Sequence, residues 1–419
     1  MQAAVDKTSL MGTAEKFADL LETKFYNSQR LPYSYLNKTT GQPFTPEEIN
    51  GYPLNFPGMP PREQWFSHEN TPMVAGHHLS GLCQQAAFTK TAPQVARVFS
   101  SIQYLSTLSE EASEPGWLCK PYGGRASQES SCDQYGAILG GLRKLALLKD
   151  HPDSANAKIL AVRLVDYWID HDYRCPFHRR PDHRWMGRHQ WGLVTMAFVR
   201  LAYELTGDPK YARESERLCR EEGCDRPNSR SGAFVFPADP QRPDHGLRKL
   251  SAFHHLVVEF LEILLSAWPE RSAHWLALLE EFWTNDVRPG LNADGLLQAT
   301  YLVDLRDNSW SIPNPQYCGS TDIPQNWIGG SLSGSMSCFA AASAVRVGQA
   351  IPRLRDDCQR FAEQILTTIN LDLVTLIIDP DGCQEHPAFG QIRTQMLDGR
   401  APAQWLQAYW QGLSLGWWR

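Results

Sequence analysis

The alternation of two kinds of helical segment is the feature that most limits the folds open to this chain. Segments of the first kind are polar on one face, with charges spread along it, and span residues 14–27, 92–111, 154–171, 209–222, 271–285 and 353–370. Segments of the second kind are apolar on nearly every side and rich in Gly, Ala and Ser, and span residues 71–89, 131–149, 190–206, 249–268, 328–348 and 403–417. The two kinds follow each other strictly, six times.

A helix that is apolar on all sides must be surrounded by protein, whereas a one-faced helix lies at the surface. Six alternating pairs therefore predict an inner ring of helices inside an outer ring, an (α/α)6 toroid built from helical hairpins that cannot bury their own apolar faces. Glycines such as Gly76, Gly140 and Gly141 fit this prediction, because a glycine inside a helix costs about 1 kcal/mol unless close packing compensates. A plain helical bundle explains the apolar helices but not the alternation. We find no linker, so we expect one domain over residues 1–419.

The bulk composition excludes several classes of protein. The 419 residues carry a formal net charge of −6 and no run of Lys or Arg, so we expect no nucleic-acid partner. No stretch is long and apolar enough to span a membrane, so we expect no membrane partner. The N-terminus lacks the pattern of a secretory signal, which favours the cytoplasm, or the periplasm or exterior if a signal has been removed. The cysteines form no Cys-x-x-Cys pair, and we expect neither a metal nor a cofactor.

The links between helices differ from one side to the other. Links from an outer to an inner helix are long and rich in Trp, His, Arg and Pro, and span residues 28–70, 112–130, 172–189, 223–248, 286–327 and 371–402. Links in the opposite direction are short, such as "KTAP" and "TGDP". All the long links must therefore meet at the end of the ring where the inner helices begin, which we call the mouth. Long loops on one face of a rigid scaffold are where a functional site is expected.

Two polar clusters open the first and second inner helices. The stretch "QESSCDQY" holds Glu129, Asp133 and Gln134, and Glu69 and Asn70 come directly before the first inner helix. Free N–H groups at helix N-termini favour polar and anionic partners, so one interpretation of both clusters is helix capping. The other interpretation is functional, with these side chains as acid/base groups or as ligands for sugar hydroxyls.

Basic and aromatic side chains gather at the other inner-helix starts. Arg188 and His189 begin the third inner helix, and Arg248 and Lys249 begin the fourth. Cations are unfavourable at a helix N-terminus, so several together suggest a cavity for an anion such as a sugar carboxylate. The alternative is ion pairing with the nearby carboxylates. Further candidates for the substrate site are His254 and Tyr317, and Trp191 and Trp327 as sugar-stacking platforms.

The six-hairpin layout resembles the (α/α)-toroid carbohydrate-active enzymes, which include uronate polysaccharide lyases, unsaturated glucuronyl hydrolases and sugar epimerases. The segment "GRHQWG" resembles the Asn-His-x-x-Trp motif of toroid alginate lyases, and "LRKLSAFHH" resembles their Arg-rich helix. The chain departs from these motifs, because Arg188 stands in place of Asn, and His254 and His255 stand in place of Tyr. Length and helix content are most similar to polysaccharide lyase family 38, whose toroid members act on alginate or glucuronan. The resemblance implies that His189 acts at the carboxylate or as a base, and that Arg248 binds the acidic sugar.

The resemblance favours cleavage of an acidic, uronate-containing oligo- or polysaccharide by β-elimination. This reaction needs a neutralised carboxylate, a base beside the C5 proton and an acid for the leaving oxygen. The chain offers these residue types in His189, Asn70, Tyr317, Arg188 and Arg248.

Two other reactions compete with elimination. A glycoside hydrolase would use a carboxyl pair drawn from Glu69, Glu129 and Asp133, and unsaturated glucuronyl hydrolases use an Asp to protonate the vinyl ether of a lyase product. A sugar epimerase is the second alternative, and a non-catalytic toroid is the third.

Overall fold

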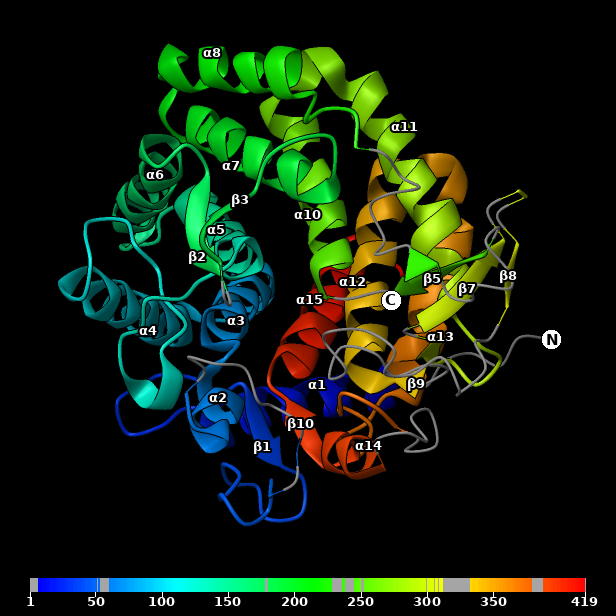
Figure 1. The fold of residues 1–419 in the computed structure, drawn as a ribbon. Helices are drawn as coiled ribbons and strands as arrows, with labels where there is room; N and C mark the ends of the chain where they lie inside the picture. Colours follow the sequence, from blue (N-terminus) through cyan, green and yellow to red (C-terminus); the bar gives the residue numbers. More distant parts are fainter. Residues whose placement is uncertain are drawn as a thin grey trace.

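The inner ring is closed. A computed structural model of the chain describes residues 7–50, 52, 60–177, 180–227, 236–237, 245–249, 252–298, 300–304, 306–307, 309–311, 332–378 and 387–418. The six inner helices are α3 (Thr71–Gln85), α5 (Cys132–Leu147), α7 (Gln190–Thr206), α10 (Ala252–Ala267), α12 (Gly334–Ala350) and α15 (Arg400–Ser414). Each inner helix packs against the next, and α15 packs against α3, so the ring has no open edge (Figure 1).

Six outer helices surround this ring. They are α1 (Lys7–Lys24), α4 (Ala92–Glu111), α6 (Ser154–Asp170), α8 (Pro209–Arg217), α11 (Ser272–Phe282) and α13 (Arg355–Thr368). Each of the last five packs on the inner helix that precedes it in the chain, whereas α1 packs on α15 and so joins the two ends of the chain (Figure 1). The ring centroids of Phe17 and Trp405 lie 5.2 Å apart at this junction. The predicted (α/α)6 toroid is confirmed.

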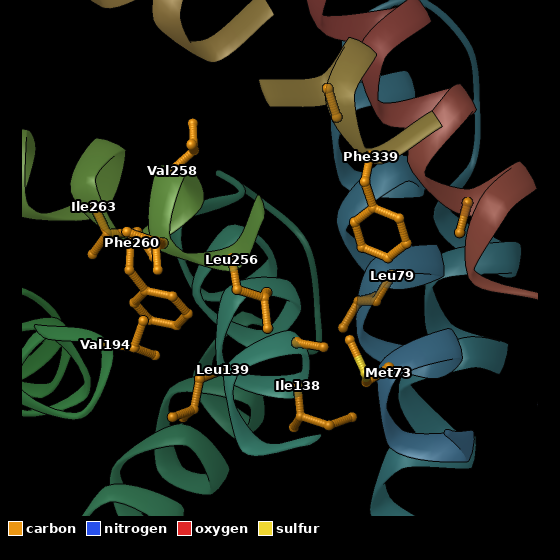
Figure 2. Packing of buried hydrophobic residues seen from close by; sticks show 14 of the residues in the cluster. Met73, Leu79, Ile138, Leu139, Val194, Leu256, Val258, Phe260, Ile263 and Phe339 are labelled. Atoms are coloured by element: carbon orange, nitrogen blue, oxygen red, sulfur yellow. The ribbon is translucent and has the colours of Figure 1, made fainter. Parts of the chain in front are cut away.

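The apolar residues of the inner helices form the core that holds the ring together. Figure 2 shows Met73, Ile138, Val194 and Phe260 extending from four inner helices into the space between them. The helices α3 and α5 approach most closely where they lack side chains. A Cβ at Gly76 would lie 2.2 Å from the carbonyl oxygen of Ala137, and no side chain fits there. No helix among the described residues is long and apolar enough to cross a membrane.

Short elements that the sequence did not reveal occupy the long links. Two are the helices α2 (Arg62–His68) and α14 (Pro387–Thr394). The others are strands in four small sheets. The pairs are β1 (Tyr35–Asn37) with β10 (Met396–Asp398), β2 (Arg174–Phe177) with β3 (Arg180–Arg184), and β6 (Leu297–Gln298) with β9 (Leu332–Ser333). The largest sheet runs β4 (Phe236–Pro237), β5 (His245–Lys249), β7 (Thr300–Asp304) and β8 (Trp310–Ser311).

Four predicted helix starts are wrong. The first outer helix starts at Lys7, seven residues before the predicted position. The other three are inner helices. Arg248 and Lys249 do not begin the fourth inner helix but end β5, where they pair with Tyr301 and Thr300, and the helix starts at Ala252. The fifth inner helix starts at Gly334 instead of residue 328, because the two residues before it pair with β6. The sixth starts at Arg400, three residues before the predicted position. For the fourth and fifth inner helices, pairing with a distant strand overrides the local pattern.

Candidate functional site

The first two inner helices bring Glu69, Asn70 and Gln134 into contact at the mouth. Asn70 precedes α3 and is 3% exposed, but its side chain caps no backbone N–H group. Its Nδ2 donates to Glu69 Oε2 at 2.5 Å and to the Tyr35 hydroxyl at 2.7 Å, and its Oδ1 accepts from Gln134 Nε2 at 3.1 Å. The capping interpretation is therefore wrong for Asn70, whose amide instead joins three other side chains.

A buried lysine connects this group to Glu129. Lys120 is 2% exposed, and its Nζ lies 3.3 Å from Glu69 Oε1 and 3.4 Å from Glu129 Oε1. The same ammonium lies 5.5 Å from the centre of the Phe177 ring. The backbone fixes this arrangement, because the Lys120 N–H donates to the Glu129 carbonyl at 2.8 Å. Lys120 therefore forms ion pairs with nearby carboxylates, which is the alternative to binding an anionic ligand.

Glu69 and Asp133 form a carboxyl pair with unequal surroundings. Burial raises the pKa of Glu69, and the negative charge of Asp133 raises it further, while Lys120 and Arg400 oppose the rise. Asp133 lies in the first turn of α5, is partly buried, and accepts hydrogen bonds from the Ser131 hydroxyl and the Gln134 N–H. A carboxyl group biased towards its protonated form, within electrostatic range of a second carboxyl group, is an arrangement suited to acid/base chemistry.

Three site residues were not singled out from the sequence. Arg400 begins α15, is 7% exposed, and donates to Asp398 through Nε at 2.9 Å and Nη2 at 2.7 Å. The same Nη2 donates to the Tyr35 hydroxyl at 3.3 Å, which links α15 to Asn70. Asp398 also accepts from the Ser335 hydroxyl at 2.6 Å. A helix start placed at Arg400 instead of residue 403 would have signalled this arginine, but no local pattern marks Tyr35.

The third inner helix presents its residues differently. His189 precedes α7, and its Nδ1 accepts from the Gly192 N–H at 3.4 Å, as a helix cap does. Burial lowers the pKa of His189, so the imidazole is neutral near pH 7. Among the described residues, no hydrogen bond or ion pair joins His189 to Glu69 or Asp133. We predicted that His189 and these carboxyl groups line the same site at the mouth, and this stays a prediction.

The neighbours of His189 lie on other surfaces. Arg188 is exposed and its side chain lies over Gly223, where a Cβ would be 2.8 Å from Nε. The Trp191 ring contacts the edge of Trp185, with centroids 4.6 Å apart, and is partly buried in the core. These contacts do not bring Arg188 or Trp191 to Asn70.

Several predicted site residues lie outside the part of the chain that the structure describes. Tyr317 and Trp327 belong to such a segment. The backbones of Arg248, Lys249 and His254 are described, but their side chains are not.

Buried polar atoms without a partner occur on four inner helices. They are Oε1 of Gln134, both amide atoms of Gln190, Oε1 of Gln404 and both ring nitrogens of His77, and none has a hydrogen-bond partner among the described residues. All four side chains are at most 1% exposed. A buried polar group without a partner costs about 1–3 kcal/mol, so these atoms call for a polar ligand or water. No cluster of His, Cys, Asp or Glu in the described part of the chain is arranged to hold a metal ion.

Comparison with known proteins finds similarity only at the level of structure. No protein-family model and no curated protein sequence matches the chain. A D-mannose isomerase structure is 12% identical, with a TM-score of 0.56, over 99% of each chain. A sugar epimerase from a ruminal bacterium is 10% identical, with a TM-score of 0.54, over 96% of this chain and 99% of its own. A variant of unsaturated glucuronyl hydrolase from Streptococcus agalactiae is 12% identical, with a TM-score of 0.53, over 98% and 93%.

These structures share the toroid fold with this chain, and they are carbohydrate-processing enzymes. The same hydrolase variant has also been solved with the disaccharide dGlcA-GalNAc6S. Identities this low show the fold alone.

Proposed function

We propose that the protein is a carbohydrate-active enzyme, a glycoside hydrolase in which Glu69 is the general acid and Asp133 the general base. The observation that carries the proposal is the unequal carboxyl pair, with the Glu69 carboxyl partly withdrawn from water and Asp133 close enough to raise its pKa. The partnerless amide atoms of Gln134, Gln190 and Gln404 supply acceptors and, at Gln190, a donor that suit sugar hydroxyls. The structural similarity to unsaturated glucuronyl hydrolase makes an oligosaccharide with a terminal unsaturated uronate the first substrate to consider.

The carboxyl pair suits this reaction in the following way. Protonated Glu69 gives its proton to C4 of the vinyl ether, and a water molecule adds to C5 while Asp133 takes the proton that the water loses. One water molecule is thereby added across the double bond. The hemiketal that forms opens to a ketone at C5 and leaves a hemiacetal at C1. Collapse of this hemiacetal to an aldehyde releases the rest of the saccharide with a free hydroxyl group.

Lys120 has a supporting role in this proposal. Its ammonium holds Glu69 and Glu129 at 3.3 and 3.4 Å and limits the rise of the Glu69 pKa. A general acid works best when its pKa lies near the working pH, so a lysine that prevents too high a value keeps Glu69 effective.

Elimination is the second candidate, and one observation favours it. Burial lowers the pKa of His189, which keeps the imidazole in the unprotonated form that a base requires. The cation beside Glu69 speaks against it, because Lys120 is already paired with two glutamates. We therefore rank hydrolysis first.

One assay separates the two reactions. The protein is incubated with dGlcA-GalNAc6S and, separately, with alginate and glucuronan, while the ultraviolet absorbance of the conjugated double bond is followed. Hydrolysis predicts a fall with the disaccharide and no change with the polymers. A rise with either polymer would overturn the proposal in favour of elimination, and no change with any substrate would overturn both.

Variants assign the reaction to the carboxyl pair. Glu69→Gln should lower the hydrolysis rate by about 100-fold or more, because the amide has no proton to give. Glu111→Gln, an exposed glutamate at the end of α4, is the matched control and should leave the rate unchanged. Full activity in Glu69→Gln would contradict the proposal.

A further inference from the structure

Three side chains meet around the ring of Phe339 in the interior of the toroid. Phe339 lies on α12 and is 1% exposed. His77 of α3 contacts its edge with ring centroids 5.3 Å apart, and His255 of α10 stacks on it at 5.8 Å. The guanidinium carbon of Arg400 lies 5.9 Å from the same ring. Because α3 and α10 are opposite members of the inner ring, Phe339 lies near its axis.

This cluster adjoins the mouth. Arg400 donates to the Tyr35 hydroxyl at 3.3 Å, and Asn70 donates to the same hydroxyl at 2.7 Å. The Asn70 amide in turn contacts Glu69. Arg400 therefore connects the Asn70 group, through Tyr35, to the Phe339 ring that His77 also contacts.

His77 differs from its neighbour in the sequence. His77 is 1% exposed, and neither ring nitrogen has a partner in the described part of the chain. His78 is also buried, but its Nδ1 is hydrogen-bonded to the Tyr26 hydroxyl at 2.9 Å. A buried imidazole with two free nitrogens is costly unless a ligand completes it.

The charges around His77 indicate the chemistry of that ligand. Arg400 pairs with Asp398, Arg346 of α12 pairs with Glu259 and Glu262 of α10, and Lys144 reaches in from α5. Burial, together with Arg346, Arg400 and Lys144, lowers the pKa of His77, while Asp398 opposes this effect. The imidazole is therefore neutral, and three cations and one carboxylate act on it. A neutral imidazole keeps one N–H group, which can donate to an anion.

Arg400 has an unused donor on the same side of the site. Two of its three guanidinium nitrogens donate to Asp398. Within the described residues, Nη1 has only the Met73 sulfur as a partner, at 3.9 Å.

We propose that His77 and the Nη1 group of Arg400 form a subsite for the carboxylate of a uronic acid. This inference deepens the proposed function, because it names the group that selects the sugar, and it rests on that function for the sugar itself. An N–H of His77 and an N–H of Arg400 donate to the two carboxylate oxygens. This proposal places acid-sugar recognition at the axis of the ring, whereas the sequence suggested Arg188 and Arg248.

Equilibrium binding tests the subsite without turnover. Calorimetry compares glucuronate with glucose, which lacks the carboxylate, on the wild-type protein. We expect glucuronate to bind at least tenfold more tightly, since hydrogen bonds to a charged group are worth about 1.5–3 kcal/mol.

Variants at adjacent positions complete the test. His77→Leu should abolish the preference for glucuronate, whereas His77→Gln, which retains an N–H donor, should keep part of it. His78→Gln is the matched control and should keep all of it. His77→Leu should fold, because it removes a partnerless polar group from the interior. If it does not fold, a weaker preference for glucuronate in His77→Gln than in His78→Gln supports the subsite, and equal preferences in the two variants overturn it. Equal binding of both sugars by the wild type, or an unchanged preference in His77→Leu, would overturn the subsite. Loss of hydrolysis alone would overturn only the proposed reaction.

Discussion

The two ends of the inner ring both bury charged side chains, but they use them differently. At the base, the end opposite the mouth, Arg346 lies 3.2 Å from both Glu259 and Glu262, and Arg143 lies 2.5 Å from Glu204. The Gln411 amide there also has partners, since it donates to Glu262 at 3.1 Å and to Gln349 at 2.7 Å. At the mouth, by contrast, Gln134, Gln190 and Gln404 each keep an amide atom without a partner among the described residues.

The base network joins helices to one another. Arg346 of α12 donates to Gln407 of α15 at 2.7 Å, and Gln407 donates to the His77 carbonyl of α3 at 2.9 Å. Gly140 of α5 admits this network, because a Cβ there would lie 2.6 Å from Glu259 Oε1. Polar groups that satisfy one another hold the ring together, whereas polar groups left without partners are available to a ligand. This contrast distinguishes buried polar groups that stabilise the fold from buried polar groups that can bind a ligand.

The largest expected effect is on the base. Arg346→Met leaves Glu259 buried without its cation, and breaking a buried pair in this way costs about 3–5 kcal/mol of unfolding free energy. Urea denaturation measures the loss. If Arg346→Met is as stable as the wild type, the base network does not stabilise the ring.

The next effect is on the mouth and should appear in rate instead of stability. Asp133→Asn removes the proposed base, so we expect the hydrolysis rate to fall by about 100-fold or more. The free energy of unfolding should change by less than about 1 kcal/mol, because the amide can still accept from Ser131 and Gln134. If Asp133→Asn loses much stability and little hydrolysis rate, the mouth serves the fold and not the reaction, which would contradict this account.

His189 offers a smaller effect that distinguishes the two reactions. Its Nδ1 caps α7, and removal of a helix cap costs about 0.5–2 kcal/mol, so His189→Ala should show a stability loss in that range. Hydrolysis by Glu69 and Asp133 predicts that its rate stays within a few-fold of the wild type. A loss comparable to that of Asp133→Asn would return His189 to the catalytic role that the sequence suggested.

The smallest effect is the pH dependence of stability at Glu69. A raised pKa means that the folded protein binds this proton more tightly than the unfolded chain does. The resulting stability is complete below the ordinary glutamate pKa of 4.5 and is lost as the pH rises through the raised value. Relative to Glu69→Gln, the wild type should therefore lose stability between that pH and neutrality. Denaturation of both proteins across this range measures the difference, and a constant difference would show that Glu69 titrates normally.

The toroid could be predicted because its signal is repeated and local. Each inner helix is apolar on all sides, and Gly76 and Gly141 mark the close approach of α3 and α5. The elements of the mouth could not be predicted, because they depend on distant partners. The strand Tyr35–Asn37 exists through its pairing with Met396–Asp398, at the other end of the chain.

The candidate site divides in the same way. Helix starts flagged Glu69, Asn70, Asp133 and Gln134, and the structure brings these four together. Tyr35 joins them only through tertiary structure, so no sequence pattern marks it.

The most direct measurement of the central claim is a crystal structure of Glu69→Gln with dGlcA-GalNAc6S bound. The account predicts the disaccharide at the mouth, with the unsaturated sugar within hydrogen-bond reach of position 69 and of Asp133, and with its carboxylate directed towards His77 and Arg400. Disaccharide bound at the base or on the outer helices, with position 69 and Asp133 untouched, would contradict the account.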